Sequence, residues 1–292
     1  MPKIHAIRTG MVQVRRPQME SRGKGLARAL HMLFDEEWSE WLPIYAWVIE
    51  HDEGIIVVDT GETSRVHRNG YHPSWHPFYQ RAVRFTVHPD EEIGPQLRAL
   101  GIAARDVRQV VLTHLHTDHA GGLIHLTGSK TWVSRQELLR ASGFQGKVQG
   151  YLPHRWPKWW QPEFLRFDNH PVGPFRQSMS LTDRGDVLVV PTPGHTPHHV
   201  SVIVCDSPSF FLAGDTSYTE RLLVEGKVDG VSPEIDIARG TLSQIAALAE
   251  EQPLVYLPSH DPESAVRLQQ ESVLRAEVTN TGSISRLPSA DA

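Results

Sequence analysis

Short apolar runs separated by polar turns divide this chain of 292 residues into two sets of predicted strands. The first set covers residues 4–14, 43–50, 55–58, 108–113 and 131–133. The second set covers residues 186–191, 200–204, 210–213 and 254–257. Apolar residues at helical spacing predict helices over about residues 91–100, 135–141 and 234–251. Since helix follows each set of strands, we expect two sheets packed face to face with helices outside.

Three segments interrupt this pattern, and a tail follows it. Residues 17–42 look irregular, and residues 62–90 are rich in His, Pro and aromatic residues without a clear element. Residues 143–176 mix Trp and Phe with prolines, which is typical of a long insertion or lid. The small polar residues 279–292 predict a frayed tail. We otherwise expect residues 1–292 to form a single domain, with Asp90 and Ser134 capping the first two helices.

Composition and charge indicate which binding partners the protein is not expected to have. The net charge is −5 and no basic stripe is present, so we do not expect a nucleic-acid partner. No run approaches membrane-spanning length and the N-terminus lacks an apolar signal core, so we expect a cytoplasmic protein without a membrane partner. The single cysteine, Cys205, excludes an intrachain disulfide and follows an apolar run, where an inert packed thiol is expected.

Residues of the metal-ligand type cluster after the strand predicted at 108–113. The run T-H-L-H-T-D-H places His114, His116, Asp118 and His119 within six positions. Imidazole nitrogens and carboxylate oxygens are ligands that borderline divalent metals take. Residues two apart in an extended segment point the same way, so His114 and His116 can reach one metal. Asp118 and His119 lie past the bend and can reach a second.

Three further candidate ligands also follow predicted strands: His195, Asp215 and His260. Strand ends at one edge of a sheet are a common way for an α/β scaffold to gather distant residues. The alternative is a set of ordinary polar loop residues, which would suffice for one histidine alone. Seven such residues at strand ends favour a metal site.

The motif T-H-L-H-T-D-H-A-G-G resembles the signature of the metallo-β-lactamase superfamily. The resemblance extends through V-D-T-G (58–61), P-G-H-T (193–196), G-D (214–215) and the final His260, roughly residues 43–265. It implies an α/β fold, the four-layer αβ/βα sandwich with two mixed sheets. It also implies two divalent metal ions per chain, with His114, His116 and His195 on one, Asp118, His119 and His260 on the other, and Asp215 bridging. We expect zinc, although iron, cobalt and manganese use the same ligands.

Within the superfamily the chain resembles the N-acyl homoserine lactonases. The resemblance rests on D-T-S-Y (215–218), L-P-I-Y-A-W-V-I-E-H (42–51), V-S-P-E (231–234) and S-H-D (259–261). True β-lactamases commonly use a cysteine where this chain has Asp215, so an antibiotic hydrolase is not expected. The chain departs from the lactonases at His198-His199, where they often read Gly-His. His198 and His199 could support the neighbouring ligand His195.

The resemblance assigns roles to individual residues. The substrate would be an acyl lactone, a small molecule opened by quorum-quenching hydrolysis. Tyr218 would donate its hydroxyl hydrogen to the developing oxyanion, or else be a rim tyrosine without a catalytic role. Asp118 would carry a proton to the leaving ring oxygen in addition to binding metal. Asp59 is expected to orient the histidine loop rather than to bind metal.

Two questions stay open at this level. The tryptophans at 156, 159 and 160, or those at 38 and 41, could line an acyl channel, form a packed surface layer, or make the interface of a homodimer. The alternative functions are a thioester hydrolase like glyoxalase II, a phosphoester or sulfate ester hydrolase, an iron-holding redox protein and, least expected, a non-catalytic protein.

Overall fold

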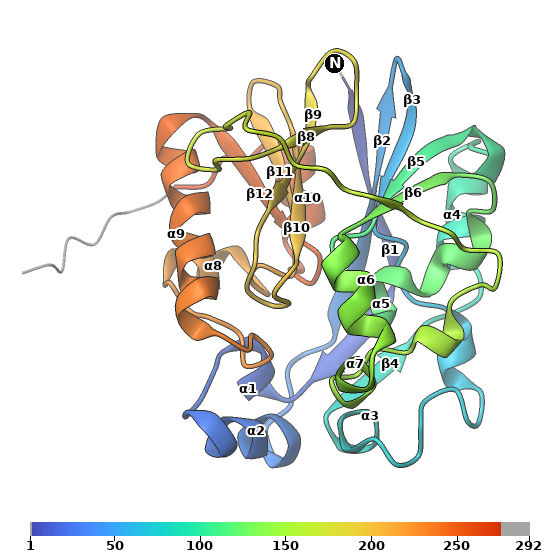
Figure 1. Ribbon diagram of the computed structural model, residues 1–292, viewed down its shortest axis with the longest axis vertical. Coiled ribbons are helices and arrows are strands. Elements are labelled where there is room, and N and C mark those ends of the chain that lie inside the picture. The colour runs from blue at the N-terminus through green and yellow to red at the C-terminus, as the bar shows by residue number, and fades with distance from the viewer. Residues whose placement is uncertain (1, 276–292) are drawn as a thin grey trace, which may run out of the picture.

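Two β-sheets form the centre of the molecule in the computed structural model, which describes residues 2–275 (Figure 1). The first has seven strands in the order β4-β1-β2-β3-β5-β6-β7. These are β4 (Val83–Thr86), β1 (Lys3–Val14), β2 (Leu42–His51), β3 (Gly54–Val58), β5 (Val107–Val111), β6 (Lys130–Val133) and β7 (Glu163–Phe164). The second has the order β12-β11-β10-β9-β8. These are β12 (Leu254–Pro258), β11 (Ser209–Gly214), β10 (Val200–Val204), β9 (Val187–Pro191) and β8 (Met179–Ser180).

Strand β2 shows why the two sheets pack face to face. Its first eight residues are buried, and successive side chains point to opposite faces. Tyr45, Trp47 and Ile49 pack against the second sheet, in a cluster with residues of β9 to β12. Ala46 and Val48 pack on the other face, against the helices. A strand buried on both faces reads as a nearly continuous apolar run, which the sequence shows.

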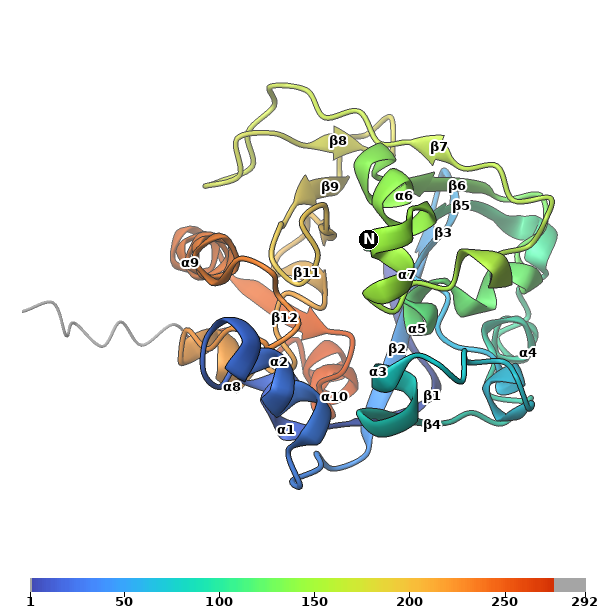
Figure 2. The ribbon, with the colours of Figure 1, turned by 60° about the horizontal axis from the view of Figure 1, so that its bottom comes forward.

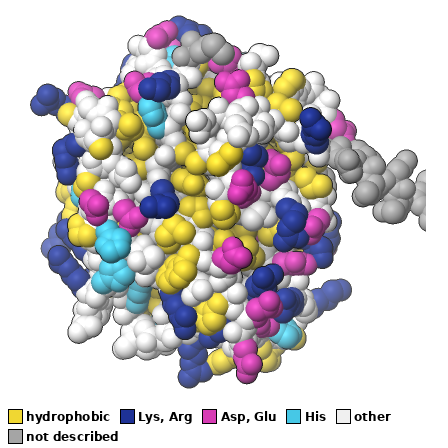
Figure 3. Space-filling model, turned by 180° about the vertical axis from the view of Figure 1, so that it is seen from behind, with side chains coloured by type: hydrophobic (Ala, Val, Ile, Leu, Met, Phe, Trp, Pro, Cys, Tyr) yellow, Lys and Arg dark blue, Asp and Glu magenta, His cyan; other side chains and the backbone are white. Residues whose placement is uncertain are grey.

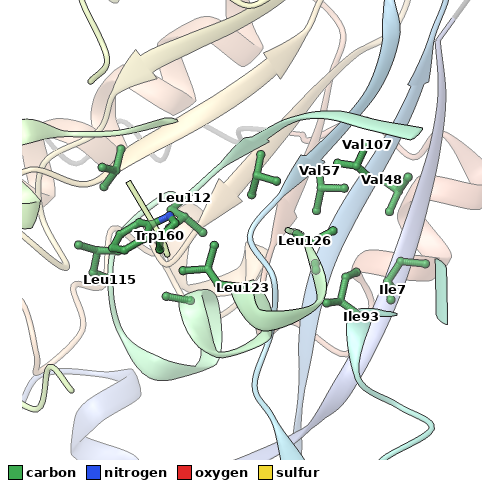
Figure 4. Packing of buried hydrophobic residues seen from close by; sticks show 14 of the residues in the cluster. Ile7, Val48, Val57, Ile93, Val107, Leu112, Leu115, Leu123, Leu126 and Trp160 are labelled. Carbon is green, nitrogen blue, oxygen red and sulfur yellow. The ribbon is translucent and has the colours of Figure 1, made fainter. Parts of the chain in front are cut away.

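Helices cover the outer face of each sheet. The first sheet carries α4 (Ile93–Ala99) and α6 (Arg135–Ser142), and Figure 4 shows the buried side chains between this sheet and its helices, including Ile93, Leu123 and Trp160. The second sheet carries α9 (Ile235–Glu251), which packs on Phe211 and Tyr256. Figure 2 shows the resulting order of layers, helix, sheet, sheet, helix. The predicted four-layer αβ/βα sandwich is therefore confirmed.

The helix predicted at 91–100 has a different start from the one expected. It begins at Ile93, and Glu92 rather than Asp90 occupies the cap position without a side-chain cap. The helix predicted at 135–141 is capped as expected, because the Ser134 hydroxyl accepts a hydrogen bond from the Glu137 amide at 3.4 Å.

The segment 17–42 is more regular than predicted. It holds α1 (Arg16–Met19) and α2 (Gly25–Phe34). The start of α2 lacks a capping side chain, and Gly23 and Gly25, both at positive φ, precede and begin it. These glycines indicate a loop in the sequence. The helix is amphipathic, and its Ala29, Met32 and Leu33 line a cavity described below.

The other two irregular segments also contain short elements. Residues 62–90 hold the 3₁₀ turn η1 (Ser64–His67), α3 (Pro77–Arg81) and β4. Residues 143–176 hold α7 (Phe144–Val148), the turn η4 (Pro153–Arg155) and β7, which extends the first sheet. The remaining short elements are α5 (Thr117–Ala120), α8 (Glu220–Val224), α10 (Ser264–Gln270), η2 (Ala104–Asp106) and η3 (Gly121–His125). The tail predicted at 279–292 lies outside the described residues.

The surface carries charges of both signs. On the face in Figure 3, Lys and Arg side chains are interspersed with Asp and Glu. No helix among residues 2–275 is long and apolar enough to cross a membrane.

Candidate metal centre

All seven predicted ligands meet between the two sheets. His114 and His116 follow β5 of the first sheet, and Asp118 and His119 lie on the short helix α5 directly after them. The others follow strands of the second sheet, which are β9 for His195, β11 for Asp215 and β12 for His260. The strands of both sheets therefore converge on one site at their ends, as the sequence predicted.

The first group consists of three histidines. His114 Nε2 lies 2.9 Å from His116 Nδ1, which lies 3.1 Å from His195 Nε2. All three rings are buried or nearly so, and their ligand atoms lie within 4.8 Å of one another. Three nitrogens that face one point at this spacing are suited to one metal ion.

The second group consists of Asp118, His119 and His260, with ligand atoms again within 4.8 Å. Asp118 Oδ2 lies 3.6 Å from His260 Nε2. Asp215 lies between the groups: its Oδ2 is 3.4 Å from both His195 Nε2 and His260 Nε2, and its Oδ1 is 3.3 Å from His119 Nε2. One carboxylate thus faces both groups, as a bridging ligand would.

The outer nitrogens of two rings have hydrogen-bond partners. His119 Nδ1 donates to Asp59 at 2.8 Å, and His260 Nδ1 donates to the Pro43 carbonyl at 2.9 Å. His195 Nδ1 lies 3.5 Å from Asp229. A proton held on the outward Nδ1 would leave the inward Nε2 of His119 and His260 as the atom that binds a metal ion.

Three buried atoms of the ligand residues lack any hydrogen-bond partner, namely His119 Nε2, His195 Nδ1 and Asp215 Oδ1. Burial, and then the neighbouring histidines, hold the pKa of His114 and His116 well below the usual range, so these rings are neutral ligands. Burial opposes the charge on Asp215, but His260, His119 and His195 outweigh it and hold its pKa well below normal. Unsatisfied buried atoms, neutral imidazoles and a carboxylate fit divalent metal ions.

Asp59 orients the segment that carries the histidine ligands, residues 113–119. It is fully buried, and its backbone has a positive φ of 59°, which Asp tolerates better than most residues. Besides His119, its carboxylate accepts from the Thr113 amide and hydroxyl, each at 2.8 Å. These three bonds hold the start of the ligand loop against the end of β3.

His199 positions the bridging aspartate. Its Nδ1 pairs with the Thr192 hydroxyl at 2.9 Å, and its Nε2 accepts from the Asp215 amide at 3.1 Å. Burial lowers the pKa of His199 to about 3, so the ring stays neutral and can accept. The sequence suggested support for His195, but the ligand that His199 supports is Asp215. His198 is only half-buried and makes no such contact.

Glu137 connects three segments around His116. Its carboxylate accepts from Tyr151 Oη at 2.7 Å, from Thr196 Oγ1 at 3.0 Å and from the Leu115 amide at 3.3 Å. The Tyr151 ring in turn packs on His116, with centroids 4.8 Å apart. Neither Glu137 nor Asp229 was predicted, because no local motif marks a carboxylate whose partners lie tens of residues away.

A cavity of about 380 Å³ opens onto the metal centre. Asp118, Asp215, His260 and Tyr218 form part of its polar end. The rest of the wall is largely apolar and includes Val12, Val14, Ala29, Met32, Leu33, Phe78, Val83 and Val231. These residues come mainly from β1, α2, α3 and β4, and α2 and α3 contact each other at one end of the molecule (Figure 2).

Tyr218 faces the centre as predicted. Its ring stacks on His260, with centroids 5.6 Å apart, and it is buried. Burial, and then the nearby Asp215, Asp229 and Asp118, raise its pKa well above the usual range. The hydroxyl therefore remains protonated at neutral pH and is available as a donor.

The tryptophans do not line this cavity. Trp160 is buried in the core beside Trp156, with ring centroids 5.1 Å apart, and Trp159 is exposed. Trp38 stacks with the guanidinium of Arg15 instead. Of the insertion at residues 143–176, only the stretch 148–151 lines the cavity, and Tyr151 is its one aromatic residue there. The other aromatic residues of the insertion pack elsewhere, such as Trp160 in the core of the first sheet and Phe175 against the second sheet.

A family model described as the metallo-beta-lactamase superfamily matches residues 39–260, about three quarters of the chain. The chain belongs to the metallo-β-lactamase superfamily. Membership agrees with the sandwich fold and with the position of the ligands at the strand ends. Metallo-β-lactamase proteins are metal-dependent, and the clusters described above are where this chain could bind metal.

Several relatives within the superfamily are lactonases. The N-acyl homoserine lactonase AiiA of Bacillus thuringiensis subsp. kurstaki is 29% identical over 237 residues, which cover 76% of this chain and 82% of AiiA. The probable metallo-hydrolase Rv2300c of Mycobacterium tuberculosis is 27% identical over 184 residues, 62% of this chain and 58% of that protein. A structure of an N-acyl homoserine lactone hydrolase with N-hexanoyl-L-homoserine bound at its catalytic metal centre superposes with a TM-score of 0.71 at 20% identity. It covers 92% of this chain and 95% of that one, which shows the shared fold.

Asp59→Asn tests the orientation of His119. The amide would no longer favour the tautomer that leaves Nε2 free, so we expect metal affinity to fall about 10- to 100-fold. Competition with a chelating dye would measure it. Asp186→Asn is the matched control, because Asp186 pairs with His51 at 3.1 Å away from the centre and should leave affinity unchanged. Equal affinity in both variants would contradict the role of Asp59.

Proposed function

We propose that this protein hydrolyses the lactone ring of N-acyl homoserine lactones with two divalent metal ions held by His114, His116, Asp118, His119, His195, Asp215 and His260. The observation that carries the proposal is a paired ligand cluster bridged by Asp215 at the polar end of a cavity whose other walls are apolar. The identity of 29% to an N-acyl homoserine lactonase supports this choice of substrate.

The bound metal ions would lower the pKa of a water molecule and polarise the lactone carbonyl. The protein supplies the remaining groups. Water oxygen bonds to the carbonyl carbon, and the protonated Tyr218 hydroxyl donates a hydrogen bond to the oxygen on which negative charge develops. The bond between the carbonyl carbon and the ring oxygen then breaks.

The leaving ring oxygen needs a proton. Asp118 lines the cavity and lies 3.6 Å from His260, beside the site where the ring would sit. In this position its carboxylate can take a proton from the attacking water and transfer it to the ring oxygen. The product is an N-acyl homoserine with a free carboxylate and a free hydroxyl, and no covalent link to the protein is needed.

The apolar wall matches an acyl chain. Met32 and Leu33 of α2 face Phe78 and Val83 across the same cavity. An alkyl chain that enters this wall gains about 0.8 kcal/mol for each buried methylene group. The amphipathic helix α2, and not the tryptophan-rich insertion, would therefore set the preference for chain length.

Ring opening of short- and long-chain N-acyl homoserine lactones, followed by proton release, tests the proposed function. The metal-loaded protein should open them, and the same protein treated with a chelator should not. Thioesters and phosphodiesters serve as comparison substrates. Protein that carries metal but opens no lactone would refute the choice of substrate.

Tyr218→Phe should lower kcat for lactone opening by about 100- to 1,000-fold while metal content stays the same, because it removes one oxyanion donor. Tyr79→Phe is a suitable control. Tyr79 lines the same cavity, but its hydroxyl already donates to the Gly150 carbonyl. If kcat is unchanged in Tyr218→Phe, the hydroxyl takes no part in the reaction.

Ala29→Phe tests the acyl wall. The larger side chain would fill the apolar end of the cavity, so we expect KM to rise more than 10-fold for decanoyl lactone and less than 2-fold for butanoyl lactone. Ala27→Phe, on the exposed face of the same helix, should change neither value. An equal effect of Ala29→Phe on both substrates would show that the tail binds elsewhere.

A further inference from the structure

A second cavity, of about 320 Å³, lies behind the metal-binding loop. Thr117 is the one residue that lines both this cavity and the one at the metal centre. The polar side chains around the second cavity are those of Thr63, Arg65, Arg68, Asn69, Tyr71, Thr117, His154 and Arg155. None of its lining residues is acidic, whereas Asp118 and Asp215 line the cavity at the metal centre.

Three arginines supply positive charge on the rim. Arg65 lies in the 3₁₀ turn η1 and Arg68 directly follows it, so their spacing of three residues places both on one side. Arg155 donates to the backbone carbonyls of Tyr71 and Gly70, and its guanidinium lies 4.7 Å from the centre of the Tyr71 ring. These contacts fix the position of Arg155, and none of its partners in them carries a negative charge.

The three guanidinium groups have no carboxylate partner among residues 2–275, because no carboxylate there lies within 4.0 Å of Arg65, Arg68 or Arg155. Glu62 lies beneath the cavity, where it accepts from the Tyr71 hydroxyl at 3.2 Å. The same oxygen also accepts from the Thr63 amide at 2.8 Å, so the hydrogen bonds of Glu62 go to the wall of the cavity and not to the arginines.

The same cavity also has apolar surface. Tyr71, Ile124, Leu152 and Trp156 line it, and Leu152 and Tyr71 belong to a buried cluster. A volume above 300 Å³ is enough for a small organic molecule. Guanidinium groups pair well with phosphate and carboxylate, and the aromatic side chains provide a surface on which a ring can pack.

We propose that this second cavity binds a small organic anion, a phosphate or carboxylate joined to an apolar or aromatic group. Its place behind Thr117 separates it from the metal centre. Its ligand is not the substrate proposed above, because an acyl lactone carries no charge. The experiments below measure anion binding and not lactone opening, so a failure of this proposal is distinguishable from a failure of the proposed lactonase activity.

Calorimetric titration of the metal-loaded protein tests the proposal with three probes, which are phenyl phosphate, benzoate and uncharged benzyl alcohol. We expect at least one of the two anions to bind, and benzyl alcohol to bind at least 10-fold more weakly. Inorganic phosphate, as a fourth titrant, should bind more weakly than phenyl phosphate if the apolar surface contributes. The two anions together distinguish a phosphate site from a carboxylate site.

The double variant R65Q/R68Q locates the site. Both side chains are exposed, so the fold should persist, and anion affinity should fall at least 10-fold. R98Q/R105Q removes two exposed arginines outside both cavities and should leave affinity unchanged. The proposal is overturned if no anion binds to the wild-type protein, or if R65Q/R68Q binds as tightly as the wild type, as it would if the anion sat at the metal centre.

Discussion

The buried carboxylate of Asp215 is the group on which the rest of this site depends. Its two oxygens lie 3.3 to 3.4 Å from nitrogens of His119, His195 and His260, which come from three different segments of the chain. A buried charge with a partner removed costs about 3–5 kcal/mol, so such a group persists only where several positive or metal-binding partners surround it. Residues that follow strands of both sheets therefore meet at this carboxylate.

The backbone conformation next to Asp215 lets other groups pack closely against it. Gly214, directly before it, has a positive φ of 56°, and a Cβ atom there would lie 2.6 Å from His199 Nε2. His199 can therefore approach closely enough for its Nε2 to accept a hydrogen bond from the Asp215 amide. On the opposite side, Asp59 holds His119 through the end of β3. Each sheet thus contributes one rigid support for the same centre.

Much of this arrangement was predictable from the sequence because its causes are local. The strand β2 has an uninterrupted apolar run, and four ligand-type residues occur within the six positions from His114 to His119. The supporting carboxylates were not predictable. Asp229 reaches His195 from 34 residues further along the chain, and Glu137 reaches Thr196 across 59 positions, and no motif contains either carboxylate. Helix α2 was missed because glycines surround its start and no side chain caps it.

The first measurement to make is the metal content per chain, by elemental analysis, in the wild type and in Asp215→Ala. We expect two divalent metal ions per wild-type chain and fewer than one in a variant that still folds, as checked by circular dichroism. Full occupancy in Asp215→Ala, or a wild-type chain that binds no divalent metal, would contradict the bridging role on which the proposed chemistry rests.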